Sequence, residues 1–123
     1  MKKKIKIMNV EWNKNEELLL RVEEGTSISA MKPMGQMLVD SDHLSFIYVV
    51  DMQDDYTYIS IPEGTWPELK KALDQHADVY ISDQKERLLL TEFHEELSYL
   101  IENIKGNSNY GERMVEKVEA LFL

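Results

Sequence analysis

Cysteine is absent from the 123 residues, and no long apolar run is present. Without cysteine, the chain cannot be a disulfide scaffold, use a thiolate nucleophile or build a zinc site on sulfur. Its longest apolar runs, such as "FIYVV", fall far short of the roughly 20 residues that cross a bilayer. The lysines at the N-terminus resemble the start of a secretory signal, but Lys6, Asn9 and Glu11 interrupt the apolar stretch that such a signal needs. We therefore expect a cytoplasmic protein that does not enter membranes.

Basic residues are missing from the middle of the chain. No Lys or Arg lies between Lys32 and Lys70, and the formal net charge is -9. Nucleic-acid binding depends on basic groups that displace counterions from phosphates, so we expect no nucleic-acid partner. The "KKK" at residues 2 to 4 is too short to reverse this balance, and we interpret it as a solvated N-terminus.

The composition is that of an ordinary folded domain. Apolar residues make up 43% of the chain and charged residues 30%. A chain of this length buries roughly two thirds of the surface that its unfolded form exposes, so it needs no disulfide or metal to fold. We expect one domain over residues 1–123.

Alternating apolar residues predict strands in the first half of the chain. Residues 5–12 and 18–24 predict a hairpin, and the shift of apolar phase between Ile7 and Met8 predicts a bulge. Residues 24–35 contain Gly25, Pro33 and Gly35 without a clear period, which predicts a connecting loop. Residues 36–61 predict three strands separated by two acidic turns, "DSDH" and "MQDD".

Helical patterns begin after residue 61. Thr65 and Glu68 match the capping box of a helix that begins at Trp66, with Pro67 in its first turn. Residues 77–90 predict two more strands around a polar turn. The following segment predicts a second helix that ends at Gly106, a glycine expected in the left-handed backbone conformation. Its apolar residues recur at helical spacing and form one stripe along the helix, which we expect to be buried; this stripe consists of Phe93, Leu97, Leu100, Ile101 and Ile104.

The last segment predicts a third helix. Asn109 and Glu112 form its expected cap pair, and one stripe is apolar, namely Tyr110, Met114, Val118, Leu121 and Phe122. The short link "GNSN" predicts a helical hairpin. The predicted fold class is therefore α+β: an antiparallel sheet or meander of about five to seven short strands, packed by one mid-chain helix and a C-terminal helical hairpin.

The quartet Asp40, Ser41, Asp42 and His43 resembles a catalytic or metal-binding cluster. Neighbouring side chains point apart, however, and hydrolase triads are assembled from residues distant in sequence. The quartet also lacks the further ligands and the glycine of a calcium loop. Asp and Ser between two strands are typical of a turn, which is our interpretation.

His94 lies among glutamates on the second predicted helix. A zinc-binding H-E-x-x-H motif would need a second histidine at position 97, where Leu97 stands. We interpret Glu92, Glu95 and Glu96 as a solvated acidic face near a helix N-terminus. The segment "IKGNSNYGE" resembles a phosphate loop, but Glu112 follows Gly111 where a lysine would be needed, so caps and a turn explain it.

Three segments carry a family resemblance: "MLVDSDHLSFIYV", "IPEGTWPELKKAL" and "FHEELSYLIENIKGNSNYGE". Together they resemble the YjbL-like family of small uncharacterised proteins from bacilli and their relatives, over nearly the whole chain. His43 departs from the glycine expected in that turn. The resemblance implies a cytoplasmic bacterial protein and supplies no mechanism.

These observations favour a non-enzymatic protein-interaction module. The partner-binding candidates are the acidic meander residues Asp51, Asp54, Asp55 and Tyr56, which would meet a protein partner; a homodimer is also compatible. We assign no catalytic residue, no metal ligand and no cofactor. The alternative is a small ligand-binding or divalent-cation-binding protein, or an enzyme, that uses the same carboxylates.

Overall fold

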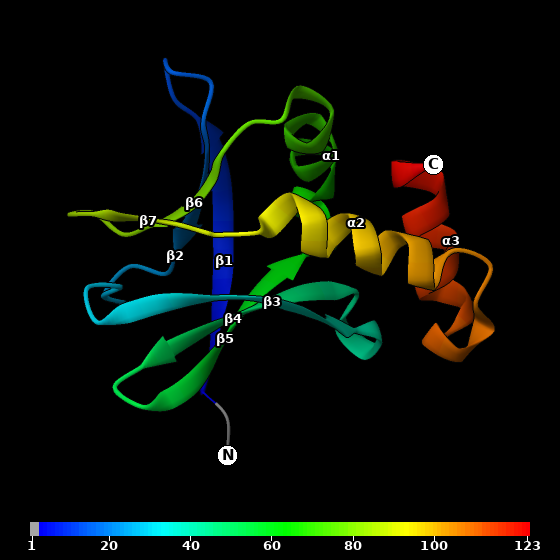
Figure 1. Ribbon diagram of the computed structural model, residues 1–123, viewed down its shortest axis with the longest axis horizontal. Helices are drawn as coiled ribbons and strands as arrows, with labels where there is room; N and C mark the ends of the chain where they lie inside the picture. Colours follow the sequence, from blue (N-terminus) through cyan, green and yellow to red (C-terminus); the bar gives the residue numbers. More distant parts are fainter. Residues whose placement is uncertain (1–2) are drawn as a thin grey trace.

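Seven strands form one curled sheet in the computed structural model, which describes residues 3–123 (Figure 1). Their spatial order is β3-β4-β5-β1-β2-β6-β7. The α+β prediction is confirmed. The strands are β1 (Lys3–Trp12), β2 (Leu18–Val22), β3 (Met31–Asp40), β4 (Ser45–Met52), β5 (Asp55–Pro62), β6 (Val79–Ser82) and β7 (Arg87–Leu89).

The sheet is mixed, whereas the sequence predicted antiparallel pairing. β1 pairs with β5 in parallel, with Ile5 opposite Ile59, and β2 pairs with β6 in parallel, with Leu20 opposite Ile81. All other pairings are antiparallel. The β1–β2 hairpin therefore lies in the middle of the sheet, between strands that follow it in the chain.

The first hairpin is confirmed, including its bulge. The register between β1 and β2 shifts between Ile7 and Asn9, which leaves Met8 as the extra residue with 57% of its surface exposed. Leu18, Leu20 and Val22 alternate along β2 and are buried. A bulge of this kind bends a strand and increases its twist, which suits a curled sheet.

The loop predicted for residues 24–35 is wrong in its second half, because β3 begins at Met31. Pro33 lacks an amide donor and Gly35 has a φ of +63°, which are features of a loop in the sequence. β3 is an edge strand, however, and its register with β4 shifts between Pro33 and Met37. Edge strands and bulges are the places where a sheet tolerates proline and glycine.

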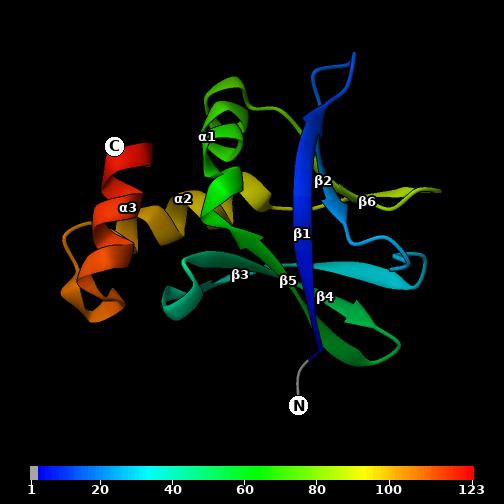
Figure 2. The same cartoon turned by 180° about the vertical axis from the view of Figure 1, so that it is seen from behind.

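Three helices pack on the concave side of the sheet (Figures 1 and 2). They are α1 (Trp66–Gln75), α2 (Phe93–Ile104) and α3 (Glu112–Phe122), with short 3-10 turns η1 (Ser41–His43), η2 (Glu63–Thr65) and η3 (Ser108–Tyr110). In both views α3 runs across the end of α2. None of the helices within residues 3–123 is long and apolar enough to cross a membrane.

The start of α1 at Trp66 was predicted correctly, but two of the predicted caps are wrong. Thr65 does not cap α1, because its hydroxyl donates to the Pro62 carbonyl at 2.8 Å. Glu68 instead accepts a hydrogen bond from the Trp12 indole at 2.6 Å. Gly111 occupies the N-cap of α3, so the predicted cap pair of Asn109 and Glu112 does not form. Gly106 is left-handed as predicted.

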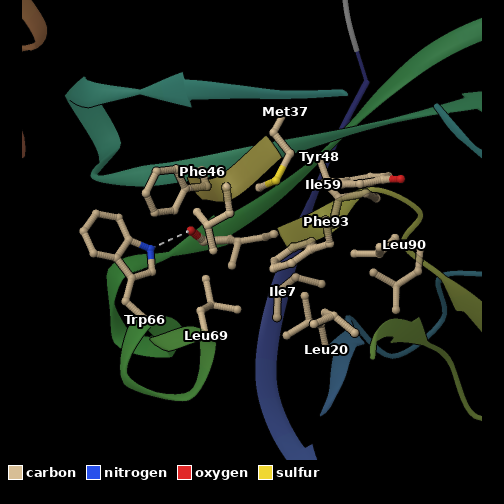
Figure 3. Packing of buried hydrophobic residues seen from close by; sticks show 14 of the residues in the cluster. Ile7, Leu20, Met37, Phe46, Tyr48, Ile59, Trp66, Leu69, Leu90 and Phe93 are labelled. Carbon is tan, nitrogen blue, oxygen red and sulfur yellow. Dashed lines mark hydrogen bonds between the residues drawn. The ribbon is translucent and has the colours of Figure 1, made fainter. Parts of the chain in front are cut away.

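One core fills the space between the sheet and the helices (Figure 3). The entire predicted stripe of α2 is buried. Aromatic rings join the sheet to the first and last helices, since Phe46 lies 4.8 Å from Trp66 and Trp66 lies 5.9 Å from Phe122 between ring centroids. Such ring pairs add to the stabilisation that burial provides.

The edge strand β3 is tied to α2 by polar groups. The Tyr48 hydroxyl accepts from the Gly35 amide at 3.2 Å and donates to the Thr91 carbonyl at 2.7 Å. In the first turn of α2, the Glu96 carboxylate accepts from the Met37 amide at 3.1 Å. These bonds satisfy edge amides that another chain could otherwise pair with.

Candidate functional site

The four predicted partner-binding residues come together at one end of the sheet. Asp51 on β4 lies opposite Tyr56 on β5, and Gln53 and Asp54 form the turn between Met52 and Asp55. Both turn residues have positive φ, 55° and 65°, as the commonest two-residue hairpin turn requires. We call Asp51, Asp54, Asp55 and Tyr56 the acidic hairpin.

The acidic hairpin presents charge that is not neutralised within the described chain. Asp54 and Asp55 are exposed, and no ion pair within residues 3–123 includes Asp51, Asp54 or Asp55. Tyr56 has 47% of its surface exposed. The Oδ1 atom of Asp51 is buried and has no hydrogen-bond partner among the described residues.

Lysines border the acidic hairpin in space, although the sequence separates them from it. Lys32 of β3 lies opposite Asp51, and Lys3 of β1 lies opposite Thr57. Lys3 and Lys4 belong to β1 and are both exposed to solvent, in agreement with the prediction of a solvated N-terminus; Lys2 lies outside the described residues. The charge of the hairpin is concentrated at its tip, beyond these lysines.

The quartet at residues 40–43 is a turn, as predicted. Asp40 caps η1, because its carboxylate accepts from the His43 amide at 3.3 Å and from the His43 ring Nδ1 at 2.9 Å. Lys4 donates to the same carboxylate at 3.2 Å. Partial burial raises the pKa of Asp40, but these hydrogen bonds outweigh it, so the pKa lies below its ordinary value. No serine hydroxyl in the described chain hydrogen-bonds to the His43 ring.

His94 belongs to the packing of α2. Its Nε2 lies 2.5 Å from the Ala77 carbonyl oxygen, so Nε2 carries the proton that is donated. Its Nδ1 is buried without a partner among residues 3–123. The prediction of a solvated glutamate face holds for Glu95, which is exposed, but is wrong for Glu96, which is half-buried on the Met37 amide.

The described residues do not bring three or more His, Asp or Glu side chains close enough to hold a metal ion. The "IKGNSNYGE" segment likewise forms a turn rather than a phosphate loop. Asn107 accepts from the Asn109 amide at 3.0 Å, and the Glu119 carboxylate accepts from the Gly106 amide at 2.8 Å. A carboxylate at this amide occupies the position that a phosphate would need.

Sequence reasoning missed a cleft of about 490 Å³ on the outer face of the sheet. Its walls come from β1, β2, the β2–β3 connection and the β6–β7 turn, and they include Arg21 and Ser82. No local motif marks these positions, because the lining residues are as far apart in the chain as Met8 and Lys85. Only the β1–β2–β6 pairing places them together.

Comparison with known sequences shows the family. The model of the UPF0738 family, a family of unknown function, matches residues 5–122. This chain belongs to the UPF0738 family. The UPF0738 protein YjbL of Bacillus subtilis is 44% identical over 123 residues and covers 100% of both chains. The resemblance to YjbL-like proteins is thereby confirmed.

Two further UPF0738 members are similar over all or nearly all of their length. A relative from Bacillus velezensis is 44% identical over 123 residues, which is 100% of each chain. One from a Geobacillus species is 37% identical over 123 residues, which is 100% of this chain and 99% of the relative. No solved structure matches the chain. Because the UPF0738 description assigns no activity, any function must be argued from the structure.

Proposed function

We propose that this UPF0738 protein is a non-enzymatic, cytoplasmic interaction module whose acidic hairpin contacts a basic segment of a partner protein. The observation that carries the proposal is the pair Asp54 and Asp55, exposed at the tip of a tight turn without an ion pair in the described chain. The turn holds both carboxylates on a rigid strand pair. Such a site loses little conformational entropy when a partner binds.

Tyr56 supplies an aromatic surface beside these charges. Tyrosine is enriched among the residues that contribute most to binding, because it offers a large contact area and a polar tip. Acidic groups beside it would steer a basic segment toward the hairpin and set its orientation. We propose no nucleic-acid or membrane partner, and the hairpin offers no pair of nucleophile and base.

The test is affinity capture with three immobilised chains at two salt concentrations. The first is wild type, and the second is the double variant Asp54→Lys/Asp55→Lys. The matched control is Asp78→Lys/Glu116→Lys, which changes the net charge equally at two exposed acids outside the hairpin. Salt is raised from about 0.1 M to about 1 M, which shortens the Debye length from roughly 10 Å to 3 Å.

We expect a protein that the wild type and the control capture at low salt and the hairpin variant does not. Identical captured sets for all three chains would refute the proposal, as would capture that ignores salt. Melting curves with magnesium, calcium, manganese or zinc address the alternative function. A rise that Asp54→Lys/Asp55→Lys abolishes would favour a cation site over a protein partner, because a ligand of the folded state raises the melting temperature.

A further inference from the structure

Strand β4 carries apolar side chains on both faces of the sheet. Phe46, Tyr48 and Val50 belong to the core between the sheet and the helices. Ile47 and Val49 alternate with them, lie outside that core, and are nevertheless only 3% exposed each. An antiparallel sheet with one solvated face normally alternates apolar and polar residues along each strand. β4 therefore has the pattern of a strand that is covered on both sides.

Neighbouring strands extend this apolar surface on the outer face. Leu38 of β3 lies opposite Ile47, and Tyr58 of β5 lies opposite Val49. Residues that lie opposite each other in a sheet point to the same side. Leu38 and Tyr58 are half-buried, and with Ile47 they line a groove of about 490 Å³. We call Leu38, Ile47, Val49 and Tyr58 the apolar row. The helices lie on the other side of the sheet, so no helix within residues 3–123 covers this row (Figure 2).

Opposite charges flank the apolar row on its two sides. The acidic hairpin continues β4 and β5 beyond the row at one end, whereas Lys6 of β1 lies opposite Ser60 on the other side. Lys6 is exposed and, like the acids of the hairpin, forms no ion pair within residues 3–123. Ser60 lies five positions from Asp55 along β5, which is about 17 Å. The two charges are therefore complementary, but they are too far apart to meet within one copy of the chain.

We propose that two copies of the chain pack outer face to outer face, about a two-fold axis that follows the apolar row. The inference rests on the proposed function and names its partner, because the basic group that the acidic hairpin contacts is Lys6 of a second copy. A two-fold axis forms both contacts at once, since each hairpin meets the other copy's Lys6. The two apolar rows then lie against each other in the middle. Repulsion between like charges disfavours packing that places one hairpin on the other.

The size of this face fits a weak, reversible dimer. It consists of the adjacent strands β3, β4, β5 and β1, which have eight to ten residues each. Strands about 4.8 Å apart with a rise of about 3.3 Å per residue give a face of roughly 19 Å by 26 Å. Two such faces together bury about 1,000 Å², which is at the low end for specific interfaces. We expect a dissociation constant of roughly 1–100 μM.

The first experiment is sedimentation velocity of the full chain from about 1 μM to about 0.5 mM, a range that brackets the expected dissociation constant. We expect a monomer–dimer equilibrium that weakens as salt is raised, because salt screens the attraction between Lys6 and the acidic hairpin. A monomer at every concentration would overturn the dimer. The role of the acidic hairpin would then depend on the capture experiment alone, so the two proposals can fail separately. A dimer that salt does not weaken would overturn the Lys6 contact.

Charge reversal tests which groups meet across the axis. Lys6→Glu alone and Asp54→Lys/Asp55→Lys alone each bring like charges together, so each variant should dimerise at least about tenfold more weakly than wild type. An equimolar mixture of the two variants should recover a heterodimer, because one of its two contacts is native and the other is the same pair with its charges exchanged. Lys14→Glu, at an exposed lysine of the β1–β2 turn, is the matched control and should dimerise as wild type does. Unchanged dimerisation of Lys6→Glu, or a mixture that stays monomeric, would contradict the assignment.

Discussion

The Tyr48 hydroxyl lies 2.7 Å from the Thr91 carbonyl oxygen, and the same hydroxyl accepts from the Gly35 amide. Tyr48 is fully buried, and burial raises the pKa of its phenol, with the nearby charges of Glu92 and Glu96 adding to the effect. One side chain thus joins the edge strand β3 to the segment that enters α2.

Tyr48→Phe should destabilise the chain by about 1–3 kcal/mol, because the Gly35 amide and the Thr91 carbonyl lose their shared partner. Urea unfolding followed by circular dichroism measures the change. Tyr99→Phe is the control, since Tyr99 is 65% exposed and should change stability by less than about 0.5 kcal/mol. Equal stability of both variants would show that the hydrogen bonds contribute nothing.

Glu96→Ala and Glu95→Ala should differ, although the two residues are neighbours. Glu96 accepts from the Met37 amide, so its removal leaves a half-buried donor without a partner and should cost about 1–3 kcal/mol. Glu95 is exposed and should tolerate alanine within about 0.5 kcal/mol. Glu96→Gln keeps an acceptor oxygen and should recover part of the loss. Equal effects of the two alanine variants in urea unfolding would argue against the contact.

Leu100→Ala should destabilise by about 2–5 kcal/mol, because Leu100 is buried in the stripe of α2 and alanine leaves a cavity there. That is a large part of the stability of a small domain. The melting temperature and the urea midpoint should both fall. A neutral result would mean that α2 does not pack on the core through this face.

Asp40 should make stability depend on pH in the acid range. Its pKa is lower in the folded chain than its ordinary value of 3.8, so the folded state favours the ionised form. The stability contribution is complete above that ordinary value and disappears as pH falls through the lower folded pKa. The stability difference between wild type and Asp40→Asn, measured by urea unfolding from about pH 6 to about pH 3, should shrink below about pH 4. A constant difference would contradict the shift.

The elements with strong local signals were predictable from the sequence. The α2 stripe, the bulge after Ile7 and the turn at Asp40 each follow from side-chain period or turn chemistry within a few residues. The predicted capping box of α1 does not form, because Glu68 binds Trp12, which lies 56 positions away in the chain. The first half of β3 was not predicted, because Pro33 and Gly35 indicate a loop unless the strand is known to lie at the edge of the sheet.

The two candidate sites likewise differ in how far apart their residues lie in the chain. The acidic hairpin could be proposed from the sequence because its residues lie close together in the chain, and the structure adds only that Asp51 and Tyr56 are paired. The cleft on the outer face could not be found, because Asn9, Arg21 and Ser82 come together through pairings between strands that are distant in the chain. Parallel pairing in particular leaves no signal in neighbouring residues.

The central position of the β1–β2 hairpin has a consequence during synthesis on the ribosome. Both edges of that hairpin are covered by strands made much later, since β5 ends at Pro62 and β6 at Ser82. Both edges of the hairpin lack their partner strands until residue 62 has left the exit tunnel, and the β2 edge lacks its partner until residue 82 has left it. Such non-local pairing slows folding and exposes strand edges to other chains. We therefore expect the β1–β2 hairpin to be the segment most open to pairing with other chains while the rest of the protein is being translated.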